Sequence, residues 1–247
     1  MTAAADATGG GGGPAPSFPP LFTGRGASSD PFGAACAAAR AGCDAGLVVH
    51  DIRLDRLRAA IVFAPEVPLS EAAVMLPLCG VGFQNAFGTC APPEVAVHLD
   101  WTGAIRINGA VAGGLRMAAD PRDPATEPNW LVIGLDLAMM GVSDAPGSTP
   151  DTTTLFDEGC AEVDPVALLE AWARHTLVWI NRWSEGDVRG LHREWSGLVH
   201  GLNAPATVAG LSGTFIGVDD RFGMLLKPEG GDAQALPLTD LLEDTHP

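Results

Sequence analysis

The chain has 247 residues, of which 47% are hydrophobic, and 30 acidic against 14 basic residues give it a net charge of −16. This length predicts one good-sized domain, or one with a small second domain, around a substantial core. The negative charge excludes nucleic acids and anionic membranes as natural partners, because phosphate binding needs a basic face. The sequence shows neither a long apolar run nor a basic leader followed by an apolar one. We therefore expect no membrane span, no signal peptide and a cytoplasmic location.

Five cysteines are scattered along the chain, at positions 36, 43, 79, 90 and 160. An odd number without a Cys-x-x-Cys pair predicts small buried hydrophobes in a reducing compartment rather than disulfides or zinc ligands. The histidines also lack the spacing of metal ligands, so we expect no metal site.

The first half of the chain predicts a tail, two helices and three strands. Residues 1–20 are rich in Ala, Gly and Pro, which is typical of a disordered tail. An alanine-rich helix is expected over 31–45, starting after Ser29 or Asp30 with Pro31 in its first turn. The remaining elements are buried strands over 46–50 and 59–65, a strand with an alternating pattern over 94–101, and a helix over 70–87 with Ser70 as its N-cap.

Residues 106–118, RINGAVAGGLRMA, predict a β-hairpin. Asn108-Gly109 is a strong two-residue turn signal, since both turn positions need a positive φ. Beyond the turn, Ala112, Gly113 and Gly114 leave the second strand almost without side chains. Glycine in a strand often marks a place where something approaches the backbone closely. A ligand and a neighbouring helix are both open interpretations.

The second half predicts an apolar strand over 129–139 and two helices, one starting at Asp164-Pro165 and one over 187–202. From Thr207, short strands and Gly- and Asp-rich turns predict a small β module that must dock on the main domain to be stable. The element order predicts an α+β fold with a mainly antiparallel mixed sheet and flanking helices. The expected organisation is a tail over 1–20, a main domain over 21–205 and a small C-terminal domain over 206–247.

Two further patterns are interpreted as helix packing rather than as cofactor sites. GVGFQN at 80–85 starts like a dinucleotide-binding motif, but Asn85 stands where the third glycine belongs, and the stretch ends a helix instead of following a strand. Trp172, Trp179 and Trp183 recur at helical spacing, which is typical of a stripe of core residues.

Three segments, in this order, resemble the biotin/lipoate protein ligases: DWTGAIRINGAVAGGL at 100–115, NWLVIGLDLAM at 129–139 and GTFIGVDDRFGMLLK at 213–227. In that family a Trp-Pro-Asn-Asp motif leads into a hairpin of the form Asn-Gly-Lys-x-Ala-Gly-Ile-Leu. A strand with Gly-Ile-Gly-Ile-Asn follows, and a small SH3-like barrel ends the chain. The resemblance spans residues 28–230 and implies a class II synthetase-like sheet with an SH3-like C-terminal module.

The resemblance also implies a site for a biotin- or lipoate-like carboxylic acid against the Ala-Gly strand. It implies ATP and Mg²⁺ as cofactors wherever adenylation survives, an acceptor protein of unknown identity, and a dimer, which the family often forms. Carried over by position, the ligand-binding residues are Trp101, Asn108, Ala112, Gly113, Gly114 and Gly134.

The residues that perform the family's chemistry are missing at the matching positions. Ala110 stands at the hairpin lysine, and residues 102–104 replace Pro-Asn-Asp. The short segment DIRLDRLR at 51–58 replaces a Gly-Arg-Gly-Arg-Arg-Gly loop, and Asp136 at a glycine position would repel a phosphate. Because charge builds on the α-phosphate during adenylation, the loss of these groups favours a protein that no longer makes an acyl-adenylate. No catalytic residue is assigned.

Arginines lie near the lost loop and after the hairpin: Arg53, Arg56, Arg58 and Arg116. If the strand alternates, Arg116 shares the face of Ala110 at a distance of roughly 20 Å, too far to replace the missing lysine. The three arginines of the connection either bind an anion or pair with Asp51 and Asp55 in a solvated turn, and we favour the pairing.

Two functions are therefore open. A divergent ligase or acyltransferase predicts that the four arginines converge on one cleft beside Gly113. A non-catalytic scaffold or partner-binding protein predicts a narrowed or acidic cleft into which Asp136 faces. The net negative charge disfavours docking of an acidic carrier protein.

Overall fold

The computed structural model of the protein describes residues 15–141 and 151–244. Of the predicted tail, residues 1–14 lie outside the described residues, whereas residues 15–20 belong to the fold. The backbone N–H of Ser17 donates a hydrogen bond to Glu170, and Phe18 contacts the main core. The end of the predicted tail is therefore anchored, and the expectation of disorder is wrong for this part.

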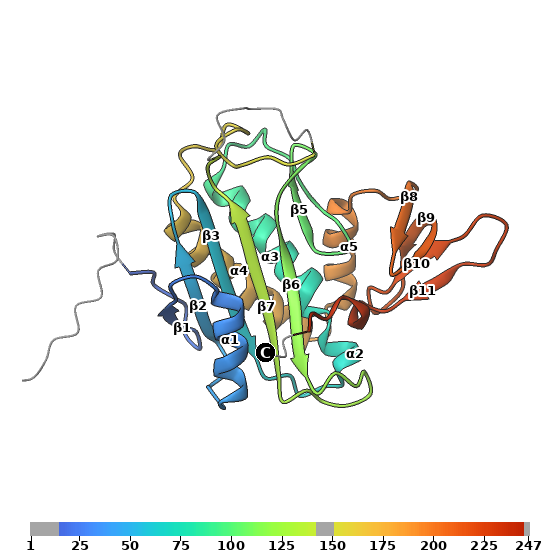
Figure 1. The fold of residues 1–247 in the computed structure, drawn as a ribbon, viewed down its shortest axis with the longest axis horizontal. Helices are drawn as coiled ribbons and strands as arrows, with labels where there is room; N and C mark the ends of the chain where they lie inside the picture. The colour runs from blue at the N-terminus through green and yellow to red at the C-terminus, as the bar shows by residue number, and fades with distance from the viewer. Residues whose placement is uncertain (1–14, 142–150, 245–247) are drawn as a thin grey trace, which may run out of the picture.

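A seven-stranded sheet forms the centre of the molecule (Figure 1). Every neighbouring pair of strands is antiparallel except β1–β2, which is parallel. This confirms the mainly antiparallel mixed sheet that the sequence predicts. In spatial order the strands are β1 (Thr23–Gly26), β2 (Leu47–Ile52), β3 (Arg56–Phe63), β7 (Trp130–Ala138), β6 (Ala110–Asp120), β5 (Ala104–Ile107) and β4 (Val97–Leu99).

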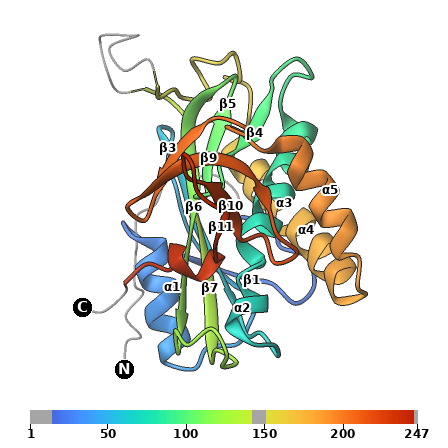
Figure 2. The same cartoon turned by 90° about the vertical axis from the view of Figure 1, so that its right-hand side faces the viewer.

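Helices cover the two faces of this sheet unequally, as Figure 2 shows. The helix α1 lies alone on one side, here named the front face, while the larger core fills the other side, the back face. The helices of the back face are α2 (Leu69–Ala72), α3 (Met75–Cys90), α4 (Pro165–Ser184) and α5 (Val188–Leu198), and the front helix α1 spans Pro31–Arg40. The front face is thus only partly covered, which leaves part of it open to solvent.

Side-chain caps start two of the helices where the sequence predicts them. Asp164 accepts a hydrogen bond from the N–H of Val166 at 2.9 Å, and Asp187 caps α5 in the same way. The cap predicted at Ser70 is wrong, because α2 begins one residue earlier, after Pro68. The N–H of Ser70 donates instead to the carbonyl of Pro124, so a distant loop satisfies the free end of this helix.

Three predicted elements are longer than the observed ones. The helix expected over 31–45 ends at Arg40, shortly before Gly42 at a φ of +80°. The helix α5 ends at Leu198, and the strand expected over 94–101 is reduced to β4.

The helix α3 packs between the sheet and α4. Residues 69–90 are long and apolar enough to cross a membrane, which corrects the expectation that no segment qualifies. Since 72% of the apolar window is buried inside the protein, its composition is that of a core helix. A Cβ on Gly82 would lie 2.9 Å from the hydroxyl of Thr176, so this glycine lets α4 approach closely. Helix packing accordingly explains both GVGFQN and the fully buried Trp172.

All five cysteines are free, as predicted. The prediction that they are buried is wrong for Cys43 and Cys90, which are half-buried, and holds for Cys36, which lies between α1 and the sheet. Burial raises the pKa of the Cys36 thiol to about 11, so the reactive thiolate is scarce at neutral pH. We expect iodoacetamide at pH 8 to leave Cys36 unmodified in the folded protein and to alkylate it after unfolding in urea. Peptide mass spectrometry measures both states, and equal labelling in the two would contradict the burial of this thiol.

A second sheet of four antiparallel strands follows the main domain, which is consistent with the predicted SH3-like module. Phe222 of this module is fully buried against α5, stacked on His192 at 3.9 Å and edge-on to Trp195. The predicted docking of the module therefore rests on a specific aromatic contact. Its elements are β8 (Pro205–Val208), β9 (Leu211–Val218), β10 (Met224–Lys227), β11 (Gln234–Leu236) and the 3-10 helix η1 (Leu238–Leu241).

Candidate functional site

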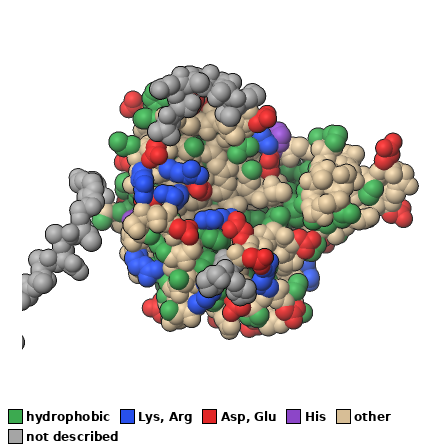
Figure 3. Space-filling model, in the orientation of Figure 1, with side chains coloured by type: hydrophobic (Ala, Val, Ile, Leu, Met, Phe, Trp, Pro, Cys, Tyr) green, Lys and Arg blue, Asp and Glu red, His purple; other side chains and the backbone are tan. Residues whose placement is uncertain are grey.

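The register of the central strands brings charged side chains to the front face. Ala60, Val132 and Ala118 face α1 there, and side chains two residues apart on a strand share a face. Arg58 of β3 is paired with Asp136 of β7, which is paired with Gly114 of β6. The next front-facing row along the strands contains Gly134 beside Arg116. Figure 3 shows Lys and Arg side chains gathered next to Asp and Glu on this side of the molecule.

The lost loop is replaced by a tight connection of residues 53–55 between β2 and β3. Arg56, just after it, forms a two-pronged ion pair with Asp136, with N–O distances of 2.5 and 3.0 Å. The hydrogen bond to Asp136 raises the pKa of the Arg56 guanidinium above its ordinary value. The partner of Arg56 is therefore Asp136 and not the predicted Asp55, and Asp136 lies on the front face of the sheet.

Asp51 neutralises two further arginines. It accepts hydrogen bonds from Arg58 at 2.5 Å and from Arg53 at 3.1 Å, and among the residues that the structure describes it is the one charged residue that is buried. Arg53 also donates to the carbonyl of Ser28, just before α1, at 2.6 Å. The interpretation of these arginines as partners of Asp51 is confirmed, and the pairs occupy their guanidinium groups.

Arg116 is held between three segments. Its guanidinium lies 4.1 Å from the centre of the Phe32 ring of α1, 3.3 Å from Asp30 and 3.5 Å from Glu243. A Cβ at position 134 would lie 2.6 Å from the Phe32 ring and 3.2 Å from Cγ of Arg116. Gly134 therefore makes room for this stack, and neither Asp30 nor Glu243 was predicted as a site residue.

The small residues of β6 make room for neighbouring strands. A Cβ on Gly113 would lie 2.1 Å from the carbonyl oxygen of Asp136 in β7, and one on Gly114 would lie 3.2 Å from the carbonyl of Gly103, just before β5. Ala112 is 2% exposed in the core of the back face. The group that approaches these glycines closely is therefore the backbone of neighbouring chain segments. It is neither a helix nor a ligand, the two interpretations that the sequence left open.

A bulge in β6 also corrects the predicted facing of Ala110. The register of β5 with β6 shifts so that Ile107 pairs with Ala110 but Ile105 pairs with Gly113. Ala110 consequently lies on the face of the buried Ile107, the back face, whereas Arg116 lies on the front. Alternation fails because the bulge adds one residue to the strand.

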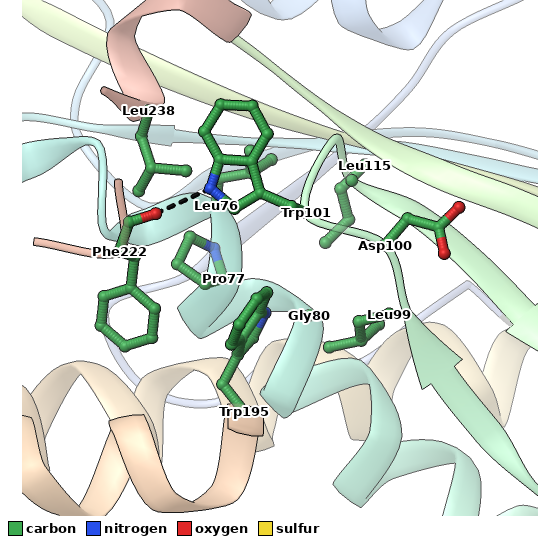
Figure 4. A pocket seen from close by; sticks show the side chains of 11 residues that line it. Leu76, Pro77, Gly80, Leu99, Asp100, Trp101, Leu115, Trp195, Phe222 and Leu238 are labelled. Atoms are coloured by element: carbon green, nitrogen blue, oxygen red, sulfur yellow. Dashed lines mark hydrogen bonds between the residues drawn. The ribbon is translucent and has the colours of Figure 1, made fainter. Parts of the chain in front are cut away.

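Two other predicted ligand residues have structural roles. The indole N–H of Trp101 donates to the carbonyl of Phe222 at 2.7 Å, beside a cavity of about 10 Å³ (Figure 4), enough for about one water molecule. Asn108 forms the predicted turn with Gly109, at φ values of 49° and 98°, accepts from the N–H of Ala96 and donates to Glu158. These side chains lie outside the charged front face.

A wide apolar groove of about 850 Å³ lies elsewhere, between the end of β3 and the helices α3 and α4. Phe63, Met75 and Trp183 are among its walls, and none of the predicted site residues lines it. Within residues 15–141 and 151–244, no cluster of His, Cys, Asp and Glu is arranged to hold a metal ion. The front face, with four arginines opposite four carboxylates, is therefore the candidate site.

Comparison with known proteins places this geometry in a family. The model of the biotin/lipoate A/B protein ligase family matches residues 18–197, and a domain of unknown function, DUF4444, matches residues 205–244. The chain therefore belongs to the biotin/lipoate A/B protein ligase family, as the sequence motifs predict. A search of curated proteins finds no match.

Solved structures agree with this assignment. A biotin protein ligase-like protein of unknown function from Silicibacter sp. TM1040 is 57% identical, with a TM-score of 0.88, over 93% of this chain and 100% of that chain. A biotin protein ligase from Aquifex aeolicus is 13% identical, with a TM-score of 0.68, over 89% and 96% of the two chains. The same Aquifex enzyme in complex with biotin and ATP is 15% identical, with a TM-score of 0.64, over 84% and 92%. The Aquifex matches support the fold.

Proposed function

We propose that this protein binds a small carboxylic acid of the biotin or lipoyl kind on its front face without activating the acid through ATP. The observation that carries the proposal is the balance of charge on this face. Arg53, Arg56, Arg58 and Arg116 already contact Asp51, Asp136, Asp30 and Glu243. The resemblance to ligases supplies the class of ligand, and the charge balance argues against the reaction.

A triphosphate does not fit this set of residues. Adenylation needs cations and backbone donors aimed at the α-phosphate, where charge develops. Here Arg56 is engaged by both oxygens of Asp136, whose carboxylate would itself repel a phosphate. A carboxylic acid carries a single charge, and it needs to displace only one carboxylate from an exposed ion pair, at a cost of about 1 kcal/mol or less.

Isothermal titration with biotin, lipoate and octanoate, each with and without MgATP, tests the proposal. We expect one of the acids to bind with a Kd that MgATP leaves unchanged, and no release of pyrophosphate. Pyrophosphate release that depends on the acid would overturn the non-activating part. Absence of heat with all three acids would overturn acid binding and favour a scaffold or partner-binding protein on the same fold.

A charge-neutral variant tests the role of Asp136 directly. Asp136→Asn frees Arg56 from its carboxylate, so we expect weak binding of MgATP to appear in this variant. Asp232→Asn, in the exposed connection between β10 and β11 of the C-terminal module, changes the net charge equally and should leave MgATP binding undetectable. MgATP binding that is equally weak or equally absent in the two variants would show that Asp136 does not prevent MgATP from binding.

The cytoplasmic location and the dimer stay predictions of the sequence.

A further inference from the structure

The segment that follows η1 completes an open edge of the main sheet. β5 pairs with β6 only as far as Gly114, and beyond that point Leu242 lies parallel to Met117. The N–H of Glu243 donates to the carbonyl of Met117 at 2.8 Å, and Leu242 is 8% exposed in the core. A segment of the C-terminal module is therefore fixed beside the strand that carries Arg116.

Of two adjacent carboxylates in this segment, one lies at the candidate site and the other lies outside it. Glu243 reaches the guanidinium of Arg116. The next residue, Asp244, pairs with Arg122, which also donates to the carbonyl of Leu242 at 2.8 Å. Two adjacent acidic side chains thus contact two different arginines, and only one of these arginines belongs to the charged front face.

Arg116 has two exposed carboxylate partners, and its contact with Glu243 is the longer one. The N–O distance is 3.5 Å for Glu243 and 3.3 Å for Asp30, and the two carboxylate side chains are 44% and 63% exposed. Asp136 instead binds Arg56 through both oxygens, and Asp51 is buried. Asp30 precedes the first turn of α1, where the helix dipole favours a negative charge.

Arg116 itself is already fixed for binding. The ring of Phe32 lies against its guanidinium and Gly134 leaves room for its stem, so little side-chain freedom remains to be lost. Glu243 is tethered by the backbone contact of its neighbour Leu242, which gives it a high effective concentration at Arg116. An incoming acid must compete with it.

We propose that Arg116 anchors the carboxylate of the bound acid and that Glu243 is an internal competitor for this anchor. This inference rests on the proposed binding of a carboxylic acid. An exposed ion pair closes with an equilibrium constant of about 1.5 to 5. Asp30 still contacts Arg116 when the charge of Glu243 is removed. The Kd of the acid then tightens by about 1.6-fold where Asp30 takes over the position of Glu243, and by up to about 6-fold where the two contacts are independent.

The test compares Glu243→Gln with Asp244→Asn in the full chain. Both variants raise the net charge by the same amount, but only the first frees Arg116. Octanoate is the probe, and octanamide, which lacks the charge, is its comparator in isothermal titration. We expect Glu243→Gln to bind octanoate about 1.6- to 6-fold more tightly than the wild type, and Asp244→Asn to bind it as the wild type does.

The possible outcomes separate this inference from the proposed function. Octanoate binding that is equal in all three proteins, or improved equally in both variants, overturns the role of Glu243 and leaves acid binding standing. Binding detected in Glu243→Gln alone supports the competition strongly. Absence of octanoate, biotin and lipoate binding from all three proteins overturns both ideas together. An equal gain for octanamide in Glu243→Gln would show that no carboxylate is being recognised.

Discussion

Replacing Gly113 by alanine should lower the free energy of unfolding by about 3 kcal/mol or more. The added Cβ would stand 2.1 Å from the carbonyl oxygen of Asp136 and 2.9 Å from Cα of Leu137. Both atoms belong to the backbone of β7, so a rotamer change cannot relieve the clash and the two strands must separate. Urea denaturation followed by circular dichroism measures the loss.

Gly88→Ala is the matched control for this substitution. A Cβ at Gly88 meets no atom within 4 Å, and the residue lies inside α3. Alanine is favoured over glycine there, so this variant should be more stable by up to about 1 kcal/mol. A Gly113→Ala protein as stable as the wild type would show that β6 and β7 yield easily, and a ligand would again be the better explanation for the small residues.

Trp101→Ala should be the second strongly destabilising substitution, with a loss of about 3 to 5 kcal/mol. The indole is 4% exposed and joins the main domain to the C-terminal module through its bond to Phe222. Trp101→Phe keeps most of the ring but loses the buried N–H donor, which costs about 1 to 3 kcal/mol. Comparing the free energies of unfolding of the wild type, Trp101→Phe and Trp101→Ala separates the contribution of the hydrogen bond from that of packing.

The position of Trp101 also predicts which connection becomes accessible to protease when the C-terminal module is released. Limited proteolysis should cut the Trp101→Ala protein after α5, within residues 199–204, before any site in the main domain. Trp183→Ala, which removes a partly buried tryptophan at the distant apolar groove, should not expose this connection. Identical fragments from both variants would contradict a specific role of Trp101 in holding the module.

Elements with a strong local signal were predicted from the sequence. The Asn108-Gly109 turn has positive φ at both residues, and Asp164 caps α4. These features depend on a few neighbouring residues, so a short window of sequence contains their cause. Ser70 failed as a cap because the partners of this helix end come from residues 124–126, which no local pattern reveals.

On the charged front face too, partners that are close in sequence could be predicted and distant ones could not. Asp51 was named as a partner of the arginines because it lies within seven positions of both Arg53 and Arg58. Glu243 and Asp30 were missed, since they reach Arg116 from the two ends of the fold. Only the strand register, and the segment after η1 that pairs with Met117, brings them together.

The contact between Leu242 and Met117 has a consequence for synthesis of the chain. The edge of β6 beyond Gly114 lies beside residue 242, so this edge stays open on the nascent chain until that residue has been made and has docked. An open strand edge is a template for pairing with another nascent chain. Chaperones that cover strand edges should therefore bind the nascent form, before residue 242 has docked, rather than the folded one.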